Sequence, residues 1–547
     1  MQATMMQTPL TTHHLLDRAA KLFGHVEIVS QAPDFSKRRH TYVDLRRRSR
    51  ALGKALQDWG LRKGERVATL MWNHHAHLEV YYGAPLAGAV YHTLNLRLSA
   101  DDLEYIVGHA KDRVLVIDDV LLPLLGKVEG RVSFDKILVV RWTDAPLPEG
   151  PWNLEDYEAF IAGGAPEDWS PGEVDENDAV GLCYTSGTTG VPKGVLFSHR
   201  ALVLHTLASA CPDMLSLSTR DTVCPVVPMF HVDAWGLPFT CTMVGAKQVH
   251  PGPHLAPDKL LDLYVSEGVN VSAGVPTIWL GILQCVQAEP DRWPLREGMR
   301  MVVGGSAAPT SLIRSMDQFG MRVIHAWGMT ETTPLGSVSV LQPRHDGLSE
   351  DGQLAIRAKQ GVASAFVDMR IIDDDGKEVA WDGVHMGELQ VRGPWIASSY
   401  FENTDAADKW TADGWFRTGD VVTIDEGGYM QITDRTKDLV KSGGEWISSV
   451  ALENALMGHP ALAEAAVIGV PHEKWSERPI GVIVAREGQA VPSKDTLNAY
   501  LEGQGFAKWW LPDGYDVRES LPRGATGKFL KRQLRDELQA WFAGSGA

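Results

Sequence analysis

The chain has 547 residues, of which 44% are hydrophobic and 22% are charged, and its formal net charge is −17. This length exceeds one ordinary domain, so we expect two or more domains of normal globular composition. The acidic balance argues against a nucleic-acid-binding protein or an anionic-membrane surface, because phosphate contacts need clustered lysine and arginine. Any anion site must therefore be a local exception.

Cysteine usage and the N-terminus indicate where the protein works. The number of cysteines is odd and no two of them form a C-x-x-C pair, so we expect reduced thiols in the cytoplasm rather than a disulfide framework or a zinc ribbon. The five are Cys183, Cys211, Cys224, Cys241 and Cys285. Residues 1–16 lack a basic start followed by an apolar core, so no signal peptide is expected. No apolar run approaches the ~18 residues of a membrane span.

Helical periodicity opens the chain and short apolar runs follow it. Segments 13–23 and 42–60 carry apolar residues at three- and four-residue spacing, which predicts two helices. Runs such as 66–72 and 136–142 are separated by helix-like stretches, which predicts parallel α/β layers. Segment 143–178 is rich in proline, glycine and acidic residues and is predicted to be a long surface connection.

In the second half of the chain the pattern of predicted strands, turns and helices changes twice. Segment 368–395 alternates short strands with glycine-containing turns, which predicts an antiparallel or β-barrel-like subdomain. Further on, 463–472 and 479–485 are predicted strands, and 494–505 and 528–542 are predicted helices. This last stretch is large enough to fold as its own small α+β domain. The fold class we expect is α/β, with a large N-terminal domain and a small C-terminal one.

A glycine- and hydroxyl-rich segment, YTSGTTGVPKG, spans residues 184–194 and follows the strand-like run 179–184. Backbone N–H groups in such a turn can converge on phosphate oxygens, and Lys193 adds a positive charge. A Walker phosphate loop would need Gly-Lys where Pro192 and Lys193 stand, so this is a different kind of anion loop. Composition alone leaves open an ordinary polar turn.

A second candidate segment is VIHAWGMTETTP, residues 323–334. Here a predicted strand ends at Trp327, whose indole could stack on a purine. The hydroxyl of Thr330 could bind a phosphate, and the carboxylate of Glu331 could hold Mg²⁺ through oxygen. The alternative is a helix N-terminus capped by Thr330.

Three more positions carry possible chemistry. Asp420, expected after a tight turn, could accept hydrogen bonds from ribose hydroxyls with Arg435 as its complement, or the two could form a hairpin ion pair on the surface. Lys528 follows a glycine-rich loop and could reach a remote anion, or be a solvated lysine at a helix start. His231 and Asp233 suggest a metal pair, but the absence of further ligands at suitable spacing argues against zinc.

In this order and spacing the motifs resemble the adenylate-forming superfamily of acyl-CoA synthetases, peptide-synthetase adenylation domains and luciferases. The resemblance covers nearly the whole chain and is closest to medium- and long-chain fatty acyl-CoA synthetases and 3-methylmercaptopropionyl-CoA ligases. The segment 441–460 is especially similar to that branch. The motifs that carry it are YTSGTTGVPKG, PMFHVDAW, VGGSAAP, WGMTET, GWFRTGD, DRTKDLVKSGGEWISS and PRGATGKFLK.

The resemblance implies a role for each matching residue. Thr185 and Glu331 would ligate Mg²⁺, Lys528 would bridge the attacking carboxylate and the α-phosphate, and His231 would line the acyl site. The residues implied to bind ATP are Ser186, Gly187, Thr188, Thr189, Gly190, Lys193, Gly305, Ser306, Ala307, Trp327, Gly328, Met329, Thr330, Asp420, Ile432 and Arg435. Those implied around CoA are Lys441, Gly443, Gly444, Glu445 and Trp446.

The implied activity is that of an ATP-dependent acid–CoA ligase, with ATP, Mg²⁺ and coenzyme A. It forms an acyl-AMP with release of pyrophosphate and then transfers the acyl group to CoA. An adenylation domain, 1–436, would be followed by a mobile domain, 437–547, that rotates about Lys437. We expect a cytoplasmic homodimer that binds a small carboxylic acid and has no nucleic-acid partner. Alternatives are an enzyme that loads a carrier protein, a luciferase-like oxygenase and a non-catalytic fatty-acid-binding relative.

Two departures from the family pattern concern the site itself. Trp327 stands where many relatives have tyrosine, so the larger ring should still stack but narrow the acyl pocket beneath it. Ser306 stands where small apolar residues are frequent. Neither change removes an essential group. The acid itself stays open, because bulky tryptophans suggest a short or medium acid whereas the long-chain relatives suggest the opposite.

Overall fold

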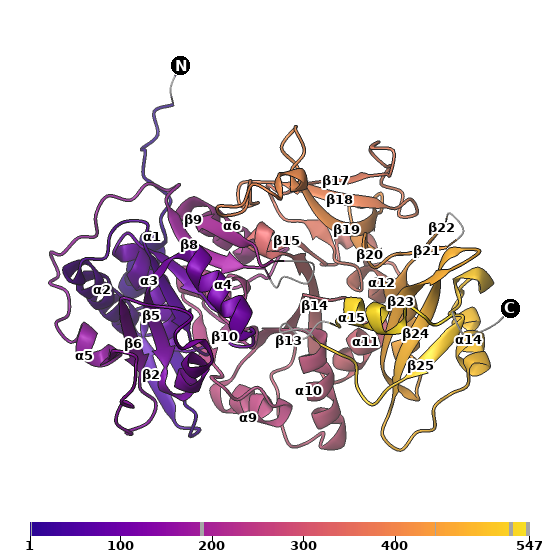
Figure 1. Ribbon diagram of the computed structural model, residues 1–547, viewed down its shortest axis with the longest axis horizontal. Helices are drawn as coiled ribbons and strands as arrows, with labels where there is room; N and C mark the ends of the chain where they lie inside the picture. The colour runs from indigo at the N-terminus through magenta and orange to yellow at the C-terminus, as the bar shows by residue number, and fades with distance from the viewer. Residues whose placement is uncertain (2, 186–190, 443–444, 524–528, 543–547) are drawn as a thin grey trace.

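The computed structural model describes residues 1, 3–185, 191–442, 445–523 and 529–542. Two sheets, each flanked by helices, build most of the chain before residue 365, a third sheet follows, and a separate C-terminal unit ends the chain (Figure 1). In the part of the chain so described, no helix combines the length and the apolar character needed to cross a membrane. The α/β fold class expected from the sequence is confirmed.

The first sheet has seven strands in the order β7-β6-β5-β3-β4-β8-β9. All neighbours are parallel except β8 and β9, which are antiparallel. The predicted runs 66–72 and 136–142 are confirmed as β3 and β6. The bounds are β3 Arg66–Leu70, β4 Val90–Thr93, β5 Asp112–Asp118, β6 Lys136–Val140, β7 Leu154–Asp156, β8 Ala179–Tyr184 and β9 Gly194–Ser198.

The second sheet has nine strands in the order β16-β15-β14-β13-β12-β10-β11-β1-β2. It is parallel from β14 to β1, with antiparallel strands at both edges. The bounds are β1 Glu27–Gln31, β2 Lys37–Thr41, β10 Thr222–Pro225, β11 Lys247–His250, β12 Val271–Gly274, β13 Met299–Val303, β14 Met321–Gly328, β15 Leu335–Val338 and β16 Val362–Ala363.

Helices cover the faces of these sheets, and the two helices predicted at the N-terminus are confirmed as α1 and α2. The α-helices are α1 Thr12–Leu22, α2 Tyr42–Trp59, α3 His75–Leu86, α4 Ala100–Ala110, α5 Tyr157–Ile161, α6 His199–Ala210, α7 Val232–Trp235, α8 Leu237–Val244, α9 Pro257–Glu267, α10 Pro276–Ala288, α11 Thr310–Gln318 and α12 Glu350–Arg357. Short 3₁₀ turns are η1 Asp119–Val128, η2 Thr330–Thr332, η3 Pro343–His345, η4 Ala407–Lys409 and η5 Lys508–Trp510.

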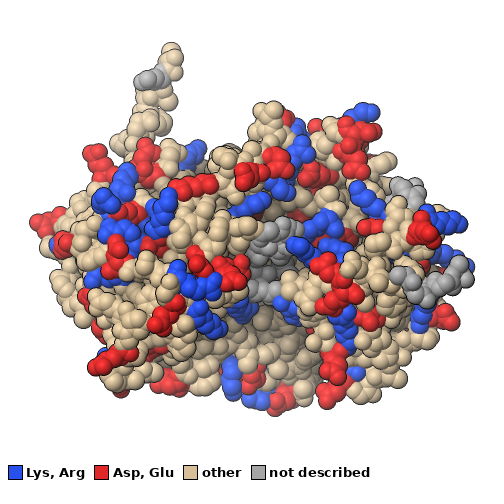
Figure 2. Space-filling model, viewed as in Figure 1, with Lys and Arg blue, Asp and Glu red and all other residues tan. Residues whose placement is uncertain are grey.

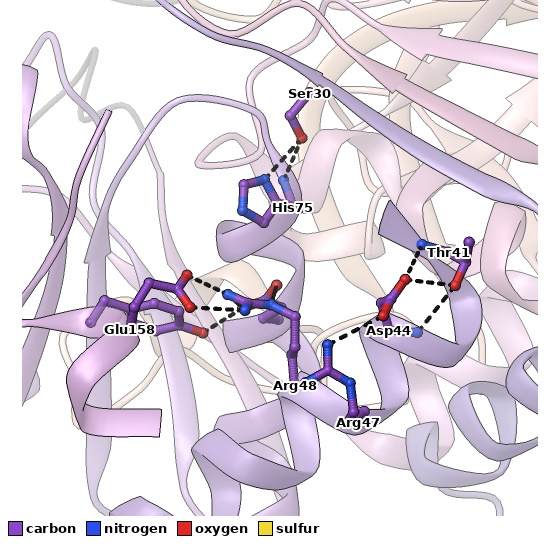
Figure 3. Close-up of polar contacts among 9 residues, drawn as sticks. Ser30, Thr41, Asp44, Arg47, Arg48, His75 and Glu158 are labelled. Atoms are coloured by element: carbon purple, nitrogen blue, oxygen red, sulfur yellow. Dashed lines mark hydrogen bonds and ion pairs between the residues drawn. The ribbon is translucent and has the colours of Figure 1, made fainter. Parts of the chain in front are cut away.

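The start of α2 shows how local sequence sets an element. Thr41 and Asp44 form a reciprocal capping box, in which the Thr41 hydroxyl accepts from the Asp44 N–H and the Asp44 carboxylate accepts from the Thr41 N–H (Figure 3). The helix then packs on α3, whose residues are all buried. Arg48 of α2 reaches across to Glu79 of α3, Nε to Oε1 at 2.6 Å, and to Glu158.

The segment 143–178 is more than the surface connection predicted from its composition. It contains β7 and α5, and within α5 Tyr157 is fully buried, its hydroxyl donating to Glu79 Oε2 at 2.7 Å. The rest of the segment is mostly exposed. Composition predicted the exposed part correctly, but it did not predict helix α5 or the burial of Tyr157, whose partner Glu79 is distant in sequence.

A four-stranded antiparallel sheet, β17-β18-β19-β20, follows the two large sheets and lies at the top of Figure 1. The antiparallel character predicted from 368–395 is confirmed. Its hydrophobic face is continuous with Trp327 and with helix α6. The bounds are β17 Asp368–Ile372, β18 Gly387–Arg392, β19 Phe416–Ile424 and β20 Met430–Arg435.

The C-terminal unit is a sheet with helices on both faces, drawn in yellow in Figure 1. Alternate residues of β23 point to opposite faces: Val467 packs with α13 and α14, and Ile468 packs with Leu534 of α15. The predicted strands and helices of this unit are confirmed as β23, β24, α14 and α15. The bounds are β21 Val440–Ser442, β22 Glu445–Ile447, β23 Leu462–His472, β24 Ser476–Ala485, β25 Gly514–Val517, α13 Ser449–Met457, α14 Lys494–Gly503 and α15 Lys531–Leu538.

Candidate active site

A cavity of about 460 Å³ lies where the three sheets of the large domain meet. The surface is hollowed near the centre of the face shown in Figure 2, on which acidic and basic side chains are interspersed. The lining of the cavity is partly apolar and partly polar. The apolar lining includes Leu215, Val302, Gly304, Ala326, Leu335 and Trp235, and the polar lining includes Thr185, Lys193, Thr330, Glu331, Tyr400, Lys409, Arg435 and Lys437.

Thr185 and Lys193 close the base of the predicted anion loop. The Thr185 N–H donates to the Lys193 carbonyl at 2.9 Å, and the Lys193 N–H donates to Thr185 Oγ1 at 3.2 Å. Both residues line the cavity, so the loop begins and ends at its wall. Ser186, Gly187, Thr188, Thr189 and Gly190 lie outside the described residues.

Glu331 is held on the floor of the cavity by Tyr400. Its side chain is buried, and Oε1 accepts a hydrogen bond from the Tyr400 hydroxyl at 2.6 Å. Burial and the neighbouring Glu331 raise the pKa of Tyr400, so that the phenol stays a donor. Lys193 Nζ lies 5.1 Å from the centroid of the Tyr400 ring. The sequence did not point to Tyr400 or to Lys409, because neither belongs to a recognised motif.

Trp327, Asp420 and Arg435 form a connected group from three strands. Trp327 Nε1 donates to Asp420 Oδ2 at 2.9 Å, and Arg435 Nε lies 3.3 Å from Asp420 Oδ1. The indole packs against Gly336, where an added Cβ would come within 2.2 Å of the ring. Only glycine therefore leaves room for this tryptophan.

Asp420 differs from its predicted setting. The sequence placed it after a tight turn, whereas the structure puts it inside β19, directly opposite Arg435 of β20. The ion pair of the alternative interpretation does form, but Asp420 is buried beside the cavity and Arg435 lines it. The pair is thus part of the site and not a surface feature.

The predicted nucleotide segments reach the cavity to different extents. Gly305, Gly328, Met329 and Thr330 line it, with Gly328 and Met329 at the end of β14 and Thr330 in η2. Ser306, Ala307 and Ile432 do not belong to its lining. The Ile432 N–H instead donates to Gln360 Oε1 at 2.6 Å.

His231 and Trp235 line the cavity, whereas Asp233 does not belong to the lining. Among the described residues, three metal-competent side chains gather elsewhere, at His40, His75 and Glu79. Both Glu79 oxygens already accept from Arg48, whose place beside His75 is seen in Figure 3. A guanidinium so close to the carboxylate disfavours a bound cation, so this cluster is structural.

Among the described residues that follow Thr436, Lys437 belongs to the lining. Lys441 and Trp446, predicted to face CoA, do not line the cavity and contact each other, with Lys441 Nζ at 5.5 Å from the indole. Gly443, Gly444 and Lys528 lie outside the described residues, as does the side chain of Glu445. The structure therefore brings most of the described residues predicted for ATP to one cavity, together with His231, whereas Lys441 and Trp446 do not line it.

Comparison with known proteins identifies the family to which the chain belongs. Residues 16–401 match the family "AMP-binding enzyme", and residues 451–528 match "AMP-binding enzyme C-terminal domain". The chain belongs to the AMP-binding enzyme family.

Relatives of this AMP-binding enzyme are similar over their whole length. The chain is 46% identical to a long-chain-fatty-acid–CoA ligase of Thermus thermophilus, covering 99% of this chain and 98% of that protein. It is also 46% identical to a 3-methylmercaptopropionyl-CoA ligase of Ruegeria lacuscaerulensis, covering 100% of both.

Solved structures share the fold. The anthranilate CoA ligase AuaEII, in complex with anthranoyl-AMP, superposes with a TM-score of 0.84 at 24% identity, over 99% of this chain and 100% of that one. The Mycobacterium tuberculosis fatty acyl CoA synthetase superposes with a TM-score of 0.71 at 26% identity, over 97% and 99%.

Proposed function

We propose that this AMP-binding enzyme is an ATP-dependent acid–CoA ligase that forms an acyl-AMP and then an acyl-CoA. The observation that carries the proposal is a cavity whose lining combines apolar residues with polar groups of three motifs, among them Thr185, Glu331 and Arg435. A carboxylic acid with an apolar tail needs the apolar lining, and ATP needs the polar groups. The names of the relatives at 46% identity support the same chemistry.

Thr185 and Glu331 are the proposed Mg²⁺ ligands. They fit the ion, because both offer oxygen atoms to one cavity and the Glu331 carboxylate keeps a second oxygen beyond the one that binds Tyr400. When bound, Mg²⁺ neutralises the phosphate charge that grows as pyrophosphate leaves. Tyr400 restricts the rotation of Glu331, so the carboxylate is positioned before ATP arrives.

The nucleoside half of ATP is assigned to the Trp327, Asp420 and Arg435 group. We propose that the indole stacks on the adenine and that Asp420 accepts from the ribose hydroxyls. Arg435 pairs with one oxygen of the Asp420 carboxylate and the Trp327 N–H binds the other, so the carboxylate is oriented before ATP binds. The anion loop, 186–190, with Lys193 would hold the β- and γ-phosphates, and Thr330 would contact the α-phosphate.

Lys528 is the proposed catalytic lysine of adenylation, placed by a C-terminal domain that spans 437–547 after an adenylation domain of 1–436. Attack of a carboxylate on the α-phosphorus brings two anions together, so a positive charge there lowers the barrier. Lys441 and Trp446 are outside the present cavity, whereas CoA must reach the same acyl-AMP. A rotation about Lys437 between the two steps would bring the CoA face to the cavity.

The proposed substrate is a fatty acid or 3-methylmercaptopropionate. His231, Val232 and Trp235 line the cavity, and we propose that they contact the tail of the acid. We place the enzyme in the cytoplasm, where its free cysteines, Cys183 among them, stay reduced. We also propose a homodimer, which a sedimentation-equilibrium mass twice that of the 60.0 kDa chain would support.

The decisive experiment is ATP–pyrophosphate exchange with a series of acids from propionate to palmitate and with 3-methylmercaptopropionate. We expect acid-dependent exchange without CoA, and AMP release that needs CoA for multiple turnovers. Exchange with no acid in the series would contradict the proposal. Exchange without CoA-dependent turnover would favour an enzyme that loads another acceptor.

A further inference from the structure

The segment Val232–Trp235, α7, has an unusual backbone. All four residues have positive φ angles, 38°, 59°, 50° and 58°, and Gly236 follows at 71°. L-residues avoid this left-handed region because Cβ approaches the next carbonyl oxygen. Such conformations persist only where the surroundings impose them, and they concentrate at functional sites.

The left-handed turn divides its side chains between the cavity and the core. His231, just before it, and Val232 and Trp235 within it line the cavity. The Trp235 ring lies against Gly304, where an added Cβ would be 3.0 Å from the indole. Asp233 points the opposite way and is only 1% exposed. The turn therefore forms part of the cavity wall, and its Asp233 side chain is buried in the core on the opposite side.

The Asp233 carboxylate binds side chains from two strands of the first sheet. Its Oδ2 accepts from the Tyr91 hydroxyl at 2.8 Å, and its Oδ1 accepts from the Cys183 thiol at 3.7 Å. Tyr91 belongs to β4 and Cys183 to β8, and Cys183 precedes the cavity residue Thr185 by two positions. The turn is thus tied to the strand that leads into the anion loop.

The residues just before the turn are held in the same way. The Tyr81 hydroxyl donates to the Met229 carbonyl, and the Thr93 hydroxyl donates to the Phe230 carbonyl at 3.3 Å. These bonds fix where the chain enters the turn, but Asp233 is the polar side chain of the turn itself. Without it, the left-handed residues lose the contact that offsets their backbone strain.

We propose that Asp233 is a positioning residue which, through Tyr91, holds residues 232–235 in the left-handed turn and thereby sets the acyl wall of the cavity and the acid preference. The inference rests on the proposed function in assigning this wall to the acid. Asp233 does not touch the substrate. Its effect is exerted through Val232 and Trp235, whose positions depend on the turn.

Burial also decides which replacement of Asp233 is conservative. It raises the pKa of the carboxyl to about 7, so the group acts mainly as a hydrogen-bond partner. The amide of Asp233→Asn offers the same acceptor to Tyr91, whereas Asp233→Ala offers none. Tyr91→Phe removes the donor but keeps the ring, which stacks on Tyr81 with centroids 4.7 Å apart.

The test compares Asp233→Ala, Asp233→Asn and Tyr91→Phe with the wild-type enzyme, measuring the KM of the acid and of ATP over the series from propionate to palmitate. We expect Asp233→Ala and Tyr91→Phe to raise the KM of the preferred acid about tenfold and to flatten the preference, with the KM of ATP changed less than about twofold. Asp233→Asn should restore most of the wild-type preference.

Tyr264→Phe is the matched control. It removes one buried tyrosine hydrogen bond of the same length, 2.8 Å to Ser272, from a residue that does not line the cavity. If Asp233→Ala and Tyr91→Phe change only stability, as this control should, with an unchanged acid preference, the inference is overturned. An equal rise in the KM of acid and ATP would overturn it as well.

A crystal structure of Asp233→Ala separates this inference from the proposed function, because it needs no activity. We expect residues 232–235 to leave the left-handed region and the Trp235 ring to leave Gly304. A turn unchanged without the carboxylate would overturn the positioning role even if the enzyme is an acid–CoA ligase. If Asp233→Ala does not fold, the structure of Tyr91→Phe decides the same question by the same criterion.

Discussion

At the scale of single residues, the site depends on side chains that orient other side chains. Tyr400 holds Glu331, and Trp327 with Arg435 holds Asp420. The Tyr400 contact uses one oxygen of the Glu331 carboxylate and leaves the other to the cavity, whereas both oxygens of Asp420 have a partner. The arrangement orders the polar wall before substrates bind, which is where preorganised sites gain most of their effect.

Replacing Tyr400 with phenylalanine tests this preorganisation. The change removes one hydrogen bond to a carboxylate, worth about 1.5–3 kcal/mol, so we expect a loss of about tenfold or more in acid-dependent exchange. The Mg²⁺ concentration needed for half-maximal rate should rise, since Glu331 becomes free to rotate. Tyr429→Phe is the control, because its hydroxyl binds the Val340 carbonyl away from the cavity. An unchanged Mg²⁺ dependence in Tyr400→Phe would contradict the role.

At the scale of elements, helices α13 and α15 are joined to β20 by a buried ionic cluster. Lys531 of α15 lies 2.7 Å from Glu453 of α13, and its ammonium also donates to Ser449 Oγ at 2.7 Å. The Ser449 N–H donates to Asp434 Oδ2 of β20 at 2.6 Å. Burial raises the pKa of Glu453 to about 7 while Lys531 opposes the shift, so the pair depends on both partners.

Replacing Lys531 with methionine should destabilise the enzyme by about 3–5 kcal/mol, because a buried carboxylate loses its cation. The free energy of unfolding, from denaturant titration, is the measurement. Arg535→Met on the same helix is the control, since the Arg535 side chain is 24% exposed whereas that of Lys531 is 11% exposed. The double variant Lys531→Met with Glu453→Gln should recover much of the loss. Equal losses in Lys531→Met and Arg535→Met would show that the buried cluster is not special.

At the scale of the whole molecule, many buried histidines make the fold sensitive to acid. Burial lowers the pKa of His77, His205 and His250 to about 3 and that of His325 to about 4, against an ordinary value of 6.5. The unfolded chain therefore binds more protons than the folded one below pH 6.5. The stability that these neutral histidines contribute is fully present above that pH. It is lost as the pH falls toward the pKa values that the histidines have in the folded state.

We expect the unfolding temperature to fall steadily between pH 6.5 and about 4.5. Each such histidine contributes up to about 1.4 kcal/mol per pH unit. Asp233 and Glu453, whose pKa values burial raises to about 7, act in the opposite direction but are fewer. The measurement is calorimetry over this pH range. The pH dependence of the unfolding free energy gives the number of protons taken up on unfolding, and His77→Gln should lower that number by about one. A midpoint that does not change with pH would refute the prediction.

The proposed rotation of the C-terminal domain gives another prediction at this scale. Lys437→Pro fixes φ at the junction and restricts the residue before it, so it should hinder the change of pose. We expect thioester formation to be impaired more than adenylate formation. Single-turnover measurements of each step separate the two, and Lys437→Ala controls for loss of the charge. Equal loss in both steps would exclude a hinge at this residue.

Much of this enzyme was predictable from sequence because its elements and motifs are local. Helical periodicity placed α1 and α2, and apolar runs placed β3 and β6. The spacing of the motifs was enough to predict the family and which segments share a site. Asp420 shows the limit: its motif was recognised, but its setting within a strand depends on pairing with Arg435 of β20.

The sequence alone determined the fold class and the family, because both are encoded in short stretches whose patterns do not depend on distant partners. Only the tertiary structure showed that Tyr400 positions Glu331, that Tyr157 is buried inside a polar connection, and that Asp233 anchors a left-handed turn. These roles arise from contacts between residues more than sixty positions apart, and no local pattern records such contacts. Under our proposal the acid preference belongs with them, since residues 232 and 235 of that turn line the cavity.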